Sequence, residues 1–124
     1  MSNEFLKRNG YDATNSSNIP TGTTQTILTL IVPGNTDFMI SHFANYVADI
    51  GAWGFIKWSV QVNNIPDPIL GAVMDQLGDP SNPRELGRKV IAHPGDVVTV
   101  KLTNSAAVDY TAGVSLKGGY GRAL

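Results

Sequence analysis

Residues 55–62, FIKWSVQV, decide the fold class. From residue 56 onward, apolar and polar side chains alternate without a break. The apolar set, which an extended chain turns to one side, is Ile56, Trp58, Val60 and Val62. A strict period of two is typical of a strand with one buried face. This stretch therefore predicts a half-buried β-strand.

Similar segments follow on both sides, separated by turns at a spacing of about ten residues. Residues 24–32 are mostly β-branched and stop at Pro33-Gly34, and residues 36–47 carry apolar side chains in both phases. A hairpin is expected over residues 90–102, closed by Pro94-Gly95-Asp96. A last strand is expected over residues 109–117, and residues 118–121, GGYG, are expected to end the ordered part. The pattern predicts an all-β, antiparallel sandwich or barrel of about seven to eight strands.

The first 23 residues differ from the rest, because they are polar and hold few apolar side chains. We expect an extended N-terminal arm at 1–23 and the sandwich domain at 24–124. A docked arm is favoured over a disordered one, because the segment combines apolar anchors with two cations. The anchors are Phe5, Leu6 and Tyr11, and the cations are Lys7 and Arg8. A frayed end without a role is the alternative.

Residues 65–87 leave two structures open. Leu70, Val73, Met74 and Leu77 have helical spacing, and Asp67 is placed as an N-cap, so residues 67–78 fit one short helix. Gly71 and four nearby prolines instead favour a long irregular connection.

Composition excludes several classes of function. Nine Lys and Arg against ten Asp and Glu provide no basic surplus for a phosphate backbone, so no nucleic-acid partner is expected. The absence of Cys removes disulfides, thiolate zinc sites and thiol nucleophiles. No apolar run approaches the length of about 20 residues that a membrane-spanning helix needs, and no secretory signal is visible, so we expect no membrane partner.

No known catalytic motif is present, so we expect no enzyme, no catalytic residue, no metal and no cofactor. His42, in phase with Phe38 and Ile40, is expected to be a hydrogen-bonded histidine at the edge of the core, and His93 to lie on the surface. A metal site would need Asp37 or Asp96 as a third ligand, and nothing in the spacing requires one. The carboxylates at 67, 75, 79 and 85 could suggest a calcium site or a glycosidase pair, but the EF-hand spacing is absent and the Asp-Pro pairs at 67–68 and 79–80 are better explained as turn initiators.

Aromatic residues are a second class of candidate. Trp53 lies in the loop Gly51-Ala52-Trp53-Gly54, and Tyr120 lies near the end of the chain, so both are candidate exposed contacts. The competing role for Trp53 is that of a plug covering one end of the sandwich.

Four stretches together resemble a known group of proteins. They are residues 40–46 (ISHFANY) with Trp53, 56–63 (IKWSVQVN), 94–100 (PGDVVTV) with Asn104, and 114–120 (VSLKGGY). Over residues 24–121 the chain resembles the small, jelly-roll-like β-sandwich virion proteins of tailed bacteriophages, of the capsid decoration or cement type.

This resemblance implies a non-enzymatic structural protein, made in the host cytoplasm, that binds the outer surface of a phage capsid and stabilises the shell. Its implied partners are the major capsid protein and further copies of itself, as a dimer or trimer. The expected contact residues in the arm are Phe5, Leu6, Lys7, Arg8 and Tyr11. The alternative is a carbohydrate- or host-receptor-binding module of a phage fibre or tail, in which Trp53 would contact the ligand.

Overall fold

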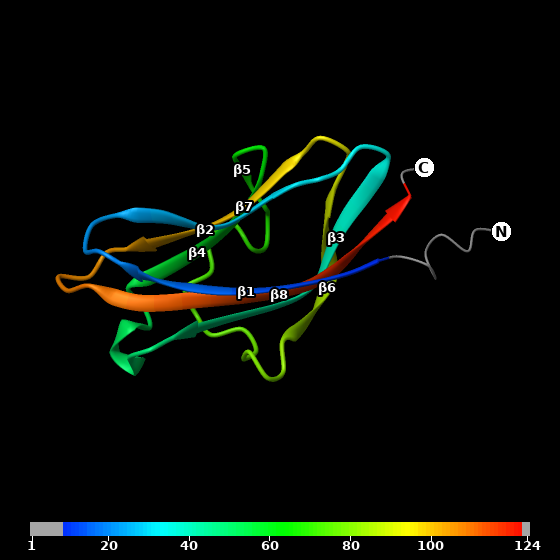
Figure 1. The fold of residues 1–124 in the computed structure, drawn as a ribbon. Coiled ribbons are helices and arrows are strands. Elements are labelled where there is room, and N and C mark those ends of the chain that lie inside the picture. The colour runs from blue at the N-terminus through cyan, green and yellow to red at the C-terminus, as the bar shows by residue number, and fades with distance from the viewer. Residues whose placement is uncertain (1–8, 123–124) are drawn as a thin grey trace.

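A computed structural model describes residues 9–122 of the 124-residue chain, and the side chains of residues 10–121. Two four-stranded antiparallel sheets face each other (Figure 1), which confirms the predicted β-sandwich. The elements are β1 (Asn9–Ile19), β2 (Thr24–Ile31), β3 (Thr36–Val47), the short 3₁₀ turn η1 (Ile50–Ala52), β4 (Ile56–Val62), β5 (Ile65–Pro66), β6 (Arg84–Ala92), β7 (Val97–Asn104) and β8 (Tyr110–Arg122).

The strand order is that of a jelly roll. One sheet has the order β1-β8-β3-β6 and the other β2-β7-β4-β5. The first strand therefore pairs with the last, the second with the seventh, the third with the sixth and the fourth with the fifth. Such nested pairing arises when a long antiparallel ribbon rolls up into two layers.

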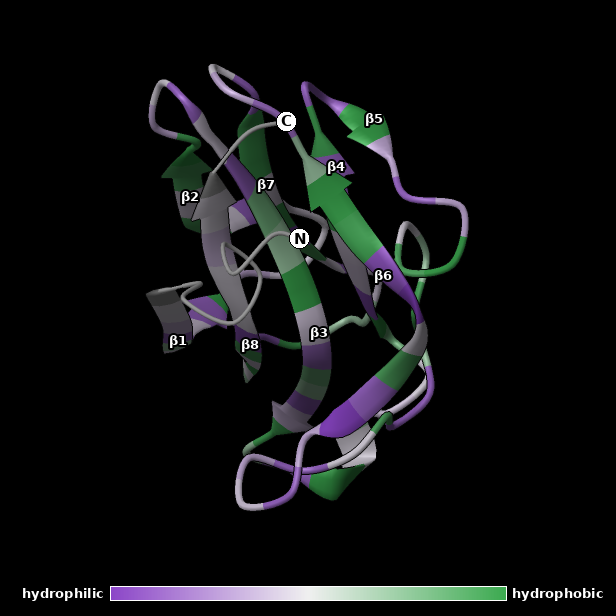
Figure 2. Cartoon of the chain, turned by 90° about the vertical axis from the view of Figure 1, so that its right-hand side faces the viewer, coloured by the Kyte–Doolittle hydropathy of each residue, from purple (hydrophilic) through white to green (hydrophobic). Residues whose placement is uncertain are grey.

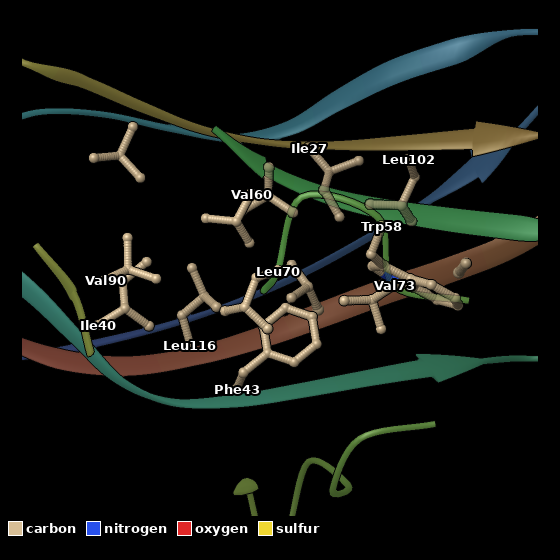
Figure 3. Packing of buried hydrophobic residues seen from close by; sticks show 14 of the residues in the cluster. Ile27, Ile40, Phe43, Trp58, Val60, Leu70, Val73, Val90, Leu102 and Leu116 are labelled. Atoms are coloured by element: carbon tan, nitrogen blue, oxygen red, sulfur yellow. The ribbon is translucent and has the colours of Figure 1, made fainter. Parts of the chain in front are cut away.

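The core lies between the two sheets and is centred on β4 (Figure 3). As its alternation predicted, Ile56, Trp58 and Val60 are fully buried while Lys57 is exposed. The largest of these side chains also makes a polar contact, because the Trp58 indole N–H donates a 2.9 Å hydrogen bond to the carbonyl oxygen of Gly113 on β8. One buried side chain thus both packs between the sheets and bonds one sheet to the other.

Residues 9–19 belong to the sandwich and do not lie apart from it. They form the edge strand β1, which pairs with β8 at eleven consecutive positions. Tyr11 and Ala13 turn inward and are half-buried, whereas Gly10, Asp12 and Thr14 are exposed. An edge strand with only a few inward side chains needs little apolar sequence, which is why its composition resembles that of an arm. The expected contact residues Phe5, Leu6, Lys7 and Arg8 lie outside the described residues.

The expected end of order at residue 117 is wrong, because β8 continues through the glycines. Residues 118–120 pair with β1 on one side and with β3 on the other, and Gly121 pairs with β3. Gly118 is required by close backbone approach: a Cβ there would overlap the carbonyl oxygen of Met39. These glycines let three strands come together.

A β-bulge changes the phase of β3. Ile40 pairs with Gly118 and His42 with Lys117, so Ser41 is the extra residue. Phe38 and Ile40 are buried before the bulge and Phe43 after it. The sequence predicted that His42 is in phase with the core, and this is wrong. Because of the bulge, His42 lies on the outer face of the sheet, opposite the exposed Lys117. It retains the expected hydrogen bond, with 2.8 Å between its Nδ1 and the Ser41 hydroxyl.

The segment between β5 and β6 is irregular, so the helical alternative for residues 67–78 is wrong. The Asp67 carboxylate accepts hydrogen bonds from the backbone of Ile69 and Leu70, which makes a single turn. The chain then runs along β4, where Leu70 and Val73 are buried and bond to the backbone of Val60 and Trp58. This segment closes the side of the sandwich.

Asn45 on β3 fastens the same segment. Its side chain is fully buried, donates to the carbonyl oxygen of Asp75 at 2.9 Å and accepts from the backbone N–H of Leu77 at 2.7 Å. These two bonds add a further attachment to those that Leu70 and Val73 make with β4.

We predict that Asn45→Ala lowers the free energy of unfolding by about 2–4 kcal/mol, because a fully buried side chain loses its two hydrogen bonds to the backbone of residues 75 and 77. Urea denaturation followed by tryptophan fluorescence measures the change. Asn18→Ala, at an exposed position of β1, is the control and should have little effect. Equal stability of the two variants would contradict this role for Asn45.

Candidate functional site

Three turns meet at one end of the sandwich, and we call this end the turn end. The turns cover residues 32–36, 63–64 and 93–96. Val32 exchanges two 2.9 Å backbone hydrogen bonds with the third turn, donating to Asp96 and accepting from Gly95, and Asn63 donates to the Val97 carbonyl at 2.8 Å. Turns from both sheets are therefore locked together.

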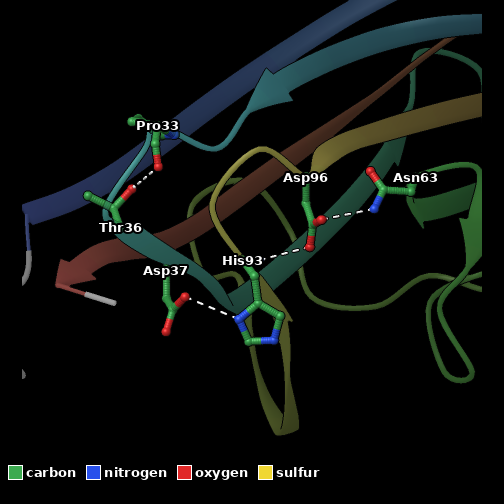
Figure 4. Close-up of polar contacts among 6 residues, drawn as sticks. All are labelled: Pro33, Thr36, Asp37, Asn63, His93 and Asp96. Carbon is green, nitrogen blue, oxygen red and sulfur yellow. Dashed lines mark hydrogen bonds and ion pairs between the residues drawn. The ribbon is translucent and has the colours of Figure 1, made fainter. Parts of the chain in front are cut away.

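Asp96 is the centre of this lock (Figure 4). Its carboxylate accepts from the backbone N–H of His93 and from the side-chain amide of Asn63, both at 2.9 Å. These hydrogen bonds hold the pKa of the Asp96 carboxyl below its usual range, and the bond from the His93 N–H has the largest effect. Beside it, 3.1 Å separates His93 Nδ1 from Asp37 Oδ1. The side chains of Asp96 and Asn63 thus help to fix the shape of the turn end.

Exposed isoleucines surround these turns. Ile31 at the end of β2 is 66% exposed, Ile65 on β5 is 70% exposed, and Ile91 near the end of β6 is 57% exposed. Figure 2 shows the hydrophobic colour of β5 and of the end of β6. Exposed apolar side chains on a rigid support are typical of a contact surface. None of the three was identified from the sequence, because strand alternation alone does not say which apolar residues of a strand end remain uncovered.

Tyr11 and Tyr120, both expected as contact residues, lie together behind this end. Their ring centroids are 6.0 Å apart, and both rings pack against Phe38, at 5.0 and 5.2 Å. Burial raises the pKa of both hydroxyls, and for Tyr11 the neighbouring Tyr120 adds to the effect. The two rings support the start of β1, where residues 1–8 join the sandwich.

The opposite end, which we call the loop end, is formed by residues 20–23, 48–55 and 105–109. Asn104, fully buried, fastens it by donating to the carbonyl oxygens of Ile19 and Val108 and accepting from the N–H of Ala106. Ile50 is 84% exposed here. The loop end thus provides a second rigid surface with an exposed isoleucine.

Trp53 lies at the loop end as a plug. Its ring is half-buried and packs on Trp58, with centroids 5.3 Å apart and planes tilted by 34°. This is the packing role that the sequence offered as the alternative to an exposed contact.

The candidate metal ligands are only partly brought together. His93 meets Asp37, but His42 pairs with Glu85 and Lys117 elsewhere on the sheet. Within residues 9–122, no three such side chains gather as a metal site would require. The Asp79 carboxylate accepts hydrogen bonds within its own turn, from the Ser81 hydroxyl and from the backbone N–H groups of Ser81 and Asn82. These bonds, chiefly the one from the Ser81 hydroxyl, lower the pKa of the Asp79 carboxyl.

His42 borders an open depression of about 540 Å³. Its other lining residues are Gly78, Asn82, Pro83, Arg84 and Glu85. The lining mixes one cation and one anion with neutral groups, so it favours no particular class of ligand.

Comparisons with known proteins add little. No family model and no curated protein matches the chain. Among solved structures, dimeric latent PorU from Porphyromonas gingivalis is similar at 10% identity and a TM-score of 0.41, over 93% of this chain and 13% of that protein. A likeness at this level carries no argument about function. In the described part of the chain, no helix is long and apolar enough to cross a membrane.

We predict that Trp53→Ala lowers the free energy of unfolding by about 1–3 kcal/mol, since a half-buried ring loses its packing on Trp58. Phe55→Ala, at a more exposed neighbouring position, should cost less. Urea denaturation measures both. Unchanged stability of Trp53→Ala would contradict the plug and favour an exposed binding residue.

We also predict that the turn end weakens in acid. Because the pKa of Asp96 is lowered in the folded state, its contribution is present above the ordinary aspartate pKa of about 3.9 and is lost as the pH falls through the lowered value. Urea midpoints measured from neutral pH downward should therefore fall less steeply below about pH 4 for Asp96→Ala than for the unaltered protein. Asp12→Ala, on the outer face of β1, is the control, and identical slopes for all three proteins would contradict the prediction.

Proposed function

We propose that this protein is a non-enzymatic structural protein of a bacteriophage particle, which binds the outer surface of the capsid through its turn end and stabilises the shell. The observation that supports this best is the turn end itself. Locked turns expose Ile31, Ile65 and Ile91, and β1, which residues 1–8 precede, begins at the same end. The proposed partner is the major capsid protein.

The rigidity of the turn end favours tight contact. When a partner docks on turns that are already ordered, little conformational entropy is lost. More of the free energy gained by burying apolar surface then contributes to binding. The three isoleucines lie on different strands, Ile31 and Ile65 in one sheet and Ile91 in the other, so a partner that contacts all three must cover the end of the sandwich. A capsid presents many identical sites, so a modest affinity at each site suffices to cover the shell when copies also contact one another.

The outer face of the second sheet is hydrophilic and differs from the turn end. Thr24, Thr26 and Thr29 on β2 lie exposed beside β7, and the hydroxyls of Thr24 and Thr103 are 2.8 Å apart. A face that is rich in hydroxyl groups and also carries Lys57 and Lys101 suits exposure to solvent on the particle surface. The expected arm contacts Phe5, Leu6, Lys7 and Arg8 extend this proposal, because they precede the strand that starts at the turn end.

The test is co-sedimentation with capsids of the cognate phage prepared without this protein. We predict that the double variant Ile65→Asp/Ile91→Asp binds at least about tenfold more weakly, since losing two apolar anchors costs more than about 1.4 kcal/mol. Deletion of residues 2–8 should weaken binding as well. A deletion through residue 23 would remove β1 and unfold the sandwich, so it would not be informative.

The matched control is Ile50→Asp, which places the same charge on an exposed isoleucine of the loop end. It should bind like the unaltered protein, and all variants should keep the same urea midpoint. If the unaltered protein does not sediment with capsids, the proposal fails. If only Ile50→Asp loses binding, the contact lies at the loop end.

A further inference from the structure

Three of the four sheet edges carry features that discourage pairing with another strand. The register of β6 against β3 breaks between Val90 and Glu85, and this edge holds Arg88 and Lys89. β2 has a bulge between positions 26 and 28, and β5 is two residues long and includes Pro66. Bulges, charges, proline and short length are the usual means by which proteins block edge-to-edge association.

The fourth edge, β1, carries one charged side chain, that of Asp12, and otherwise has none of these features. It is eleven residues long, its register with β8 is unbroken, and residues 9–19 include no Pro, Lys or Arg. Apart from its ladder with β8, no backbone–backbone hydrogen bond joins residues 9–19 to another described residue. The longest edge of the molecule is therefore also the least protected.

The direction of its free backbone groups follows from Asn15. The Tyr46 hydroxyl reaches from β3 across β8 to the Asn15 carbonyl oxygen at 3.4 Å, and a Cβ on Gly113 of β8 would lie 2.7 Å from that oxygen. The Asn15 carbonyl thus faces β8. Because successive residues of a strand alternate in direction, the backbone groups of the even-numbered residues face away from β8. These residues, all exposed, are Gly10, Asp12, Thr14, Ser16 and Asn18.

We propose that β1 pairs with the β1 strand of a second copy of this chain, antiparallel and about a two-fold axis at Thr14. Thr14 then lies opposite Thr14 of the second copy, Asp12 opposite Ser16, and Gly10 opposite Asn18. All five outward residues pair, which gives about ten hydrogen bonds between the copies at two per hydrogen-bonded pair. The result is one continuous eight-stranded sheet.

Charge and length select this register over its neighbours. An axis at Asp12 would place two carboxylates directly opposite each other, which is destabilising. An axis at Ser16 would leave Gly10 and Asp12 without partners inside the strand. The axis at Thr14 separates the two Asp12 carboxylates and sets each against a hydroxyl of Ser16, and paired Thr side chains are favourable across strands.

This inference does not depend on the capsid proposal, because it concerns the chain alone. If both hold, the two turn ends lie at opposite ends of the joined sheet, since the β1 strands run in opposite directions. One dimer would then reach two separate sites on a shell.

Sedimentation velocity of the full chain over a range of concentrations tests the pairing. The unaltered protein should dimerise as concentration rises. Thr14→Lys and Thr14→Glu should each be monomeric, because each sets like charges opposite one another at the axis. A mixture of the two variants should dimerise again. Thr29→Lys and Thr29→Glu, at an exposed position on the outer face of β2, are the controls and should dimerise like the unaltered protein.

A second variant uses the absence of cysteine from the chain. Paired residues at the axis have Cα atoms about 5.5 Å apart, within disulfide range, so Thr14→Cys should form a covalent dimer on oxidation while Thr29→Cys should not. A monomeric unaltered protein would overturn the proposal. It would also be overturned if the single charge variants dimerise, if their mixture stays monomeric, or if Thr14→Cys does not cross-link preferentially. Failure to bind capsids would leave these results unaffected.

Discussion

The structure depends on one buried contact, in which Trp58 of β4 spans the core and its indole N–H bonds to the Gly113 carbonyl of β8. Packing alone would tolerate some sliding of one sheet over the other, but a directional bond in a dry interior fixes their relative position. The same residue exchanges backbone hydrogen bonds with Val73 and carries Trp53 on its ring. The side segment and the loop end are therefore also attached to a residue that joins the sheets.

Fixing the sheets also fixes the turn end. Its turns come from both sheets, so the hydrogen bonds around Asp96 form only when β2, β4, β6 and β7 keep their relative positions. The exposed isoleucines then stand on a frame whose turns are joined by hydrogen bonds. The nested strand order has a further consequence: the first and last strands pair, and β1 is left as an edge with a regular, unblocked backbone.

The sequence predicted what strand alternation encodes. Ile56, Trp58 and Val60 are buried as expected, and the all-β class follows from several stretches of this kind. Alternation failed where a non-local partner decides the structure. The polar residues 9–19 become a strand because β8 supplies a ladder, the Gly118 region continues β8 because β3 bulges at Ser41, and Asn45 is buried because residues 75–77 return to it. The isoleucines of the turn end could not be identified, since their exposure depends on which strand ends stay uncovered.

The central claim is that the protein contacts a phage shell with its turn end. Cryo-electron microscopy of capsids saturated with the protein tests it most directly. The account predicts sandwich density on the outer surface of the shell, with the turns at 32–36, 63–64 and 93–96 against the major capsid protein. Bound density with the loop end against the shell, or no bound density on the outer surface, would contradict the account.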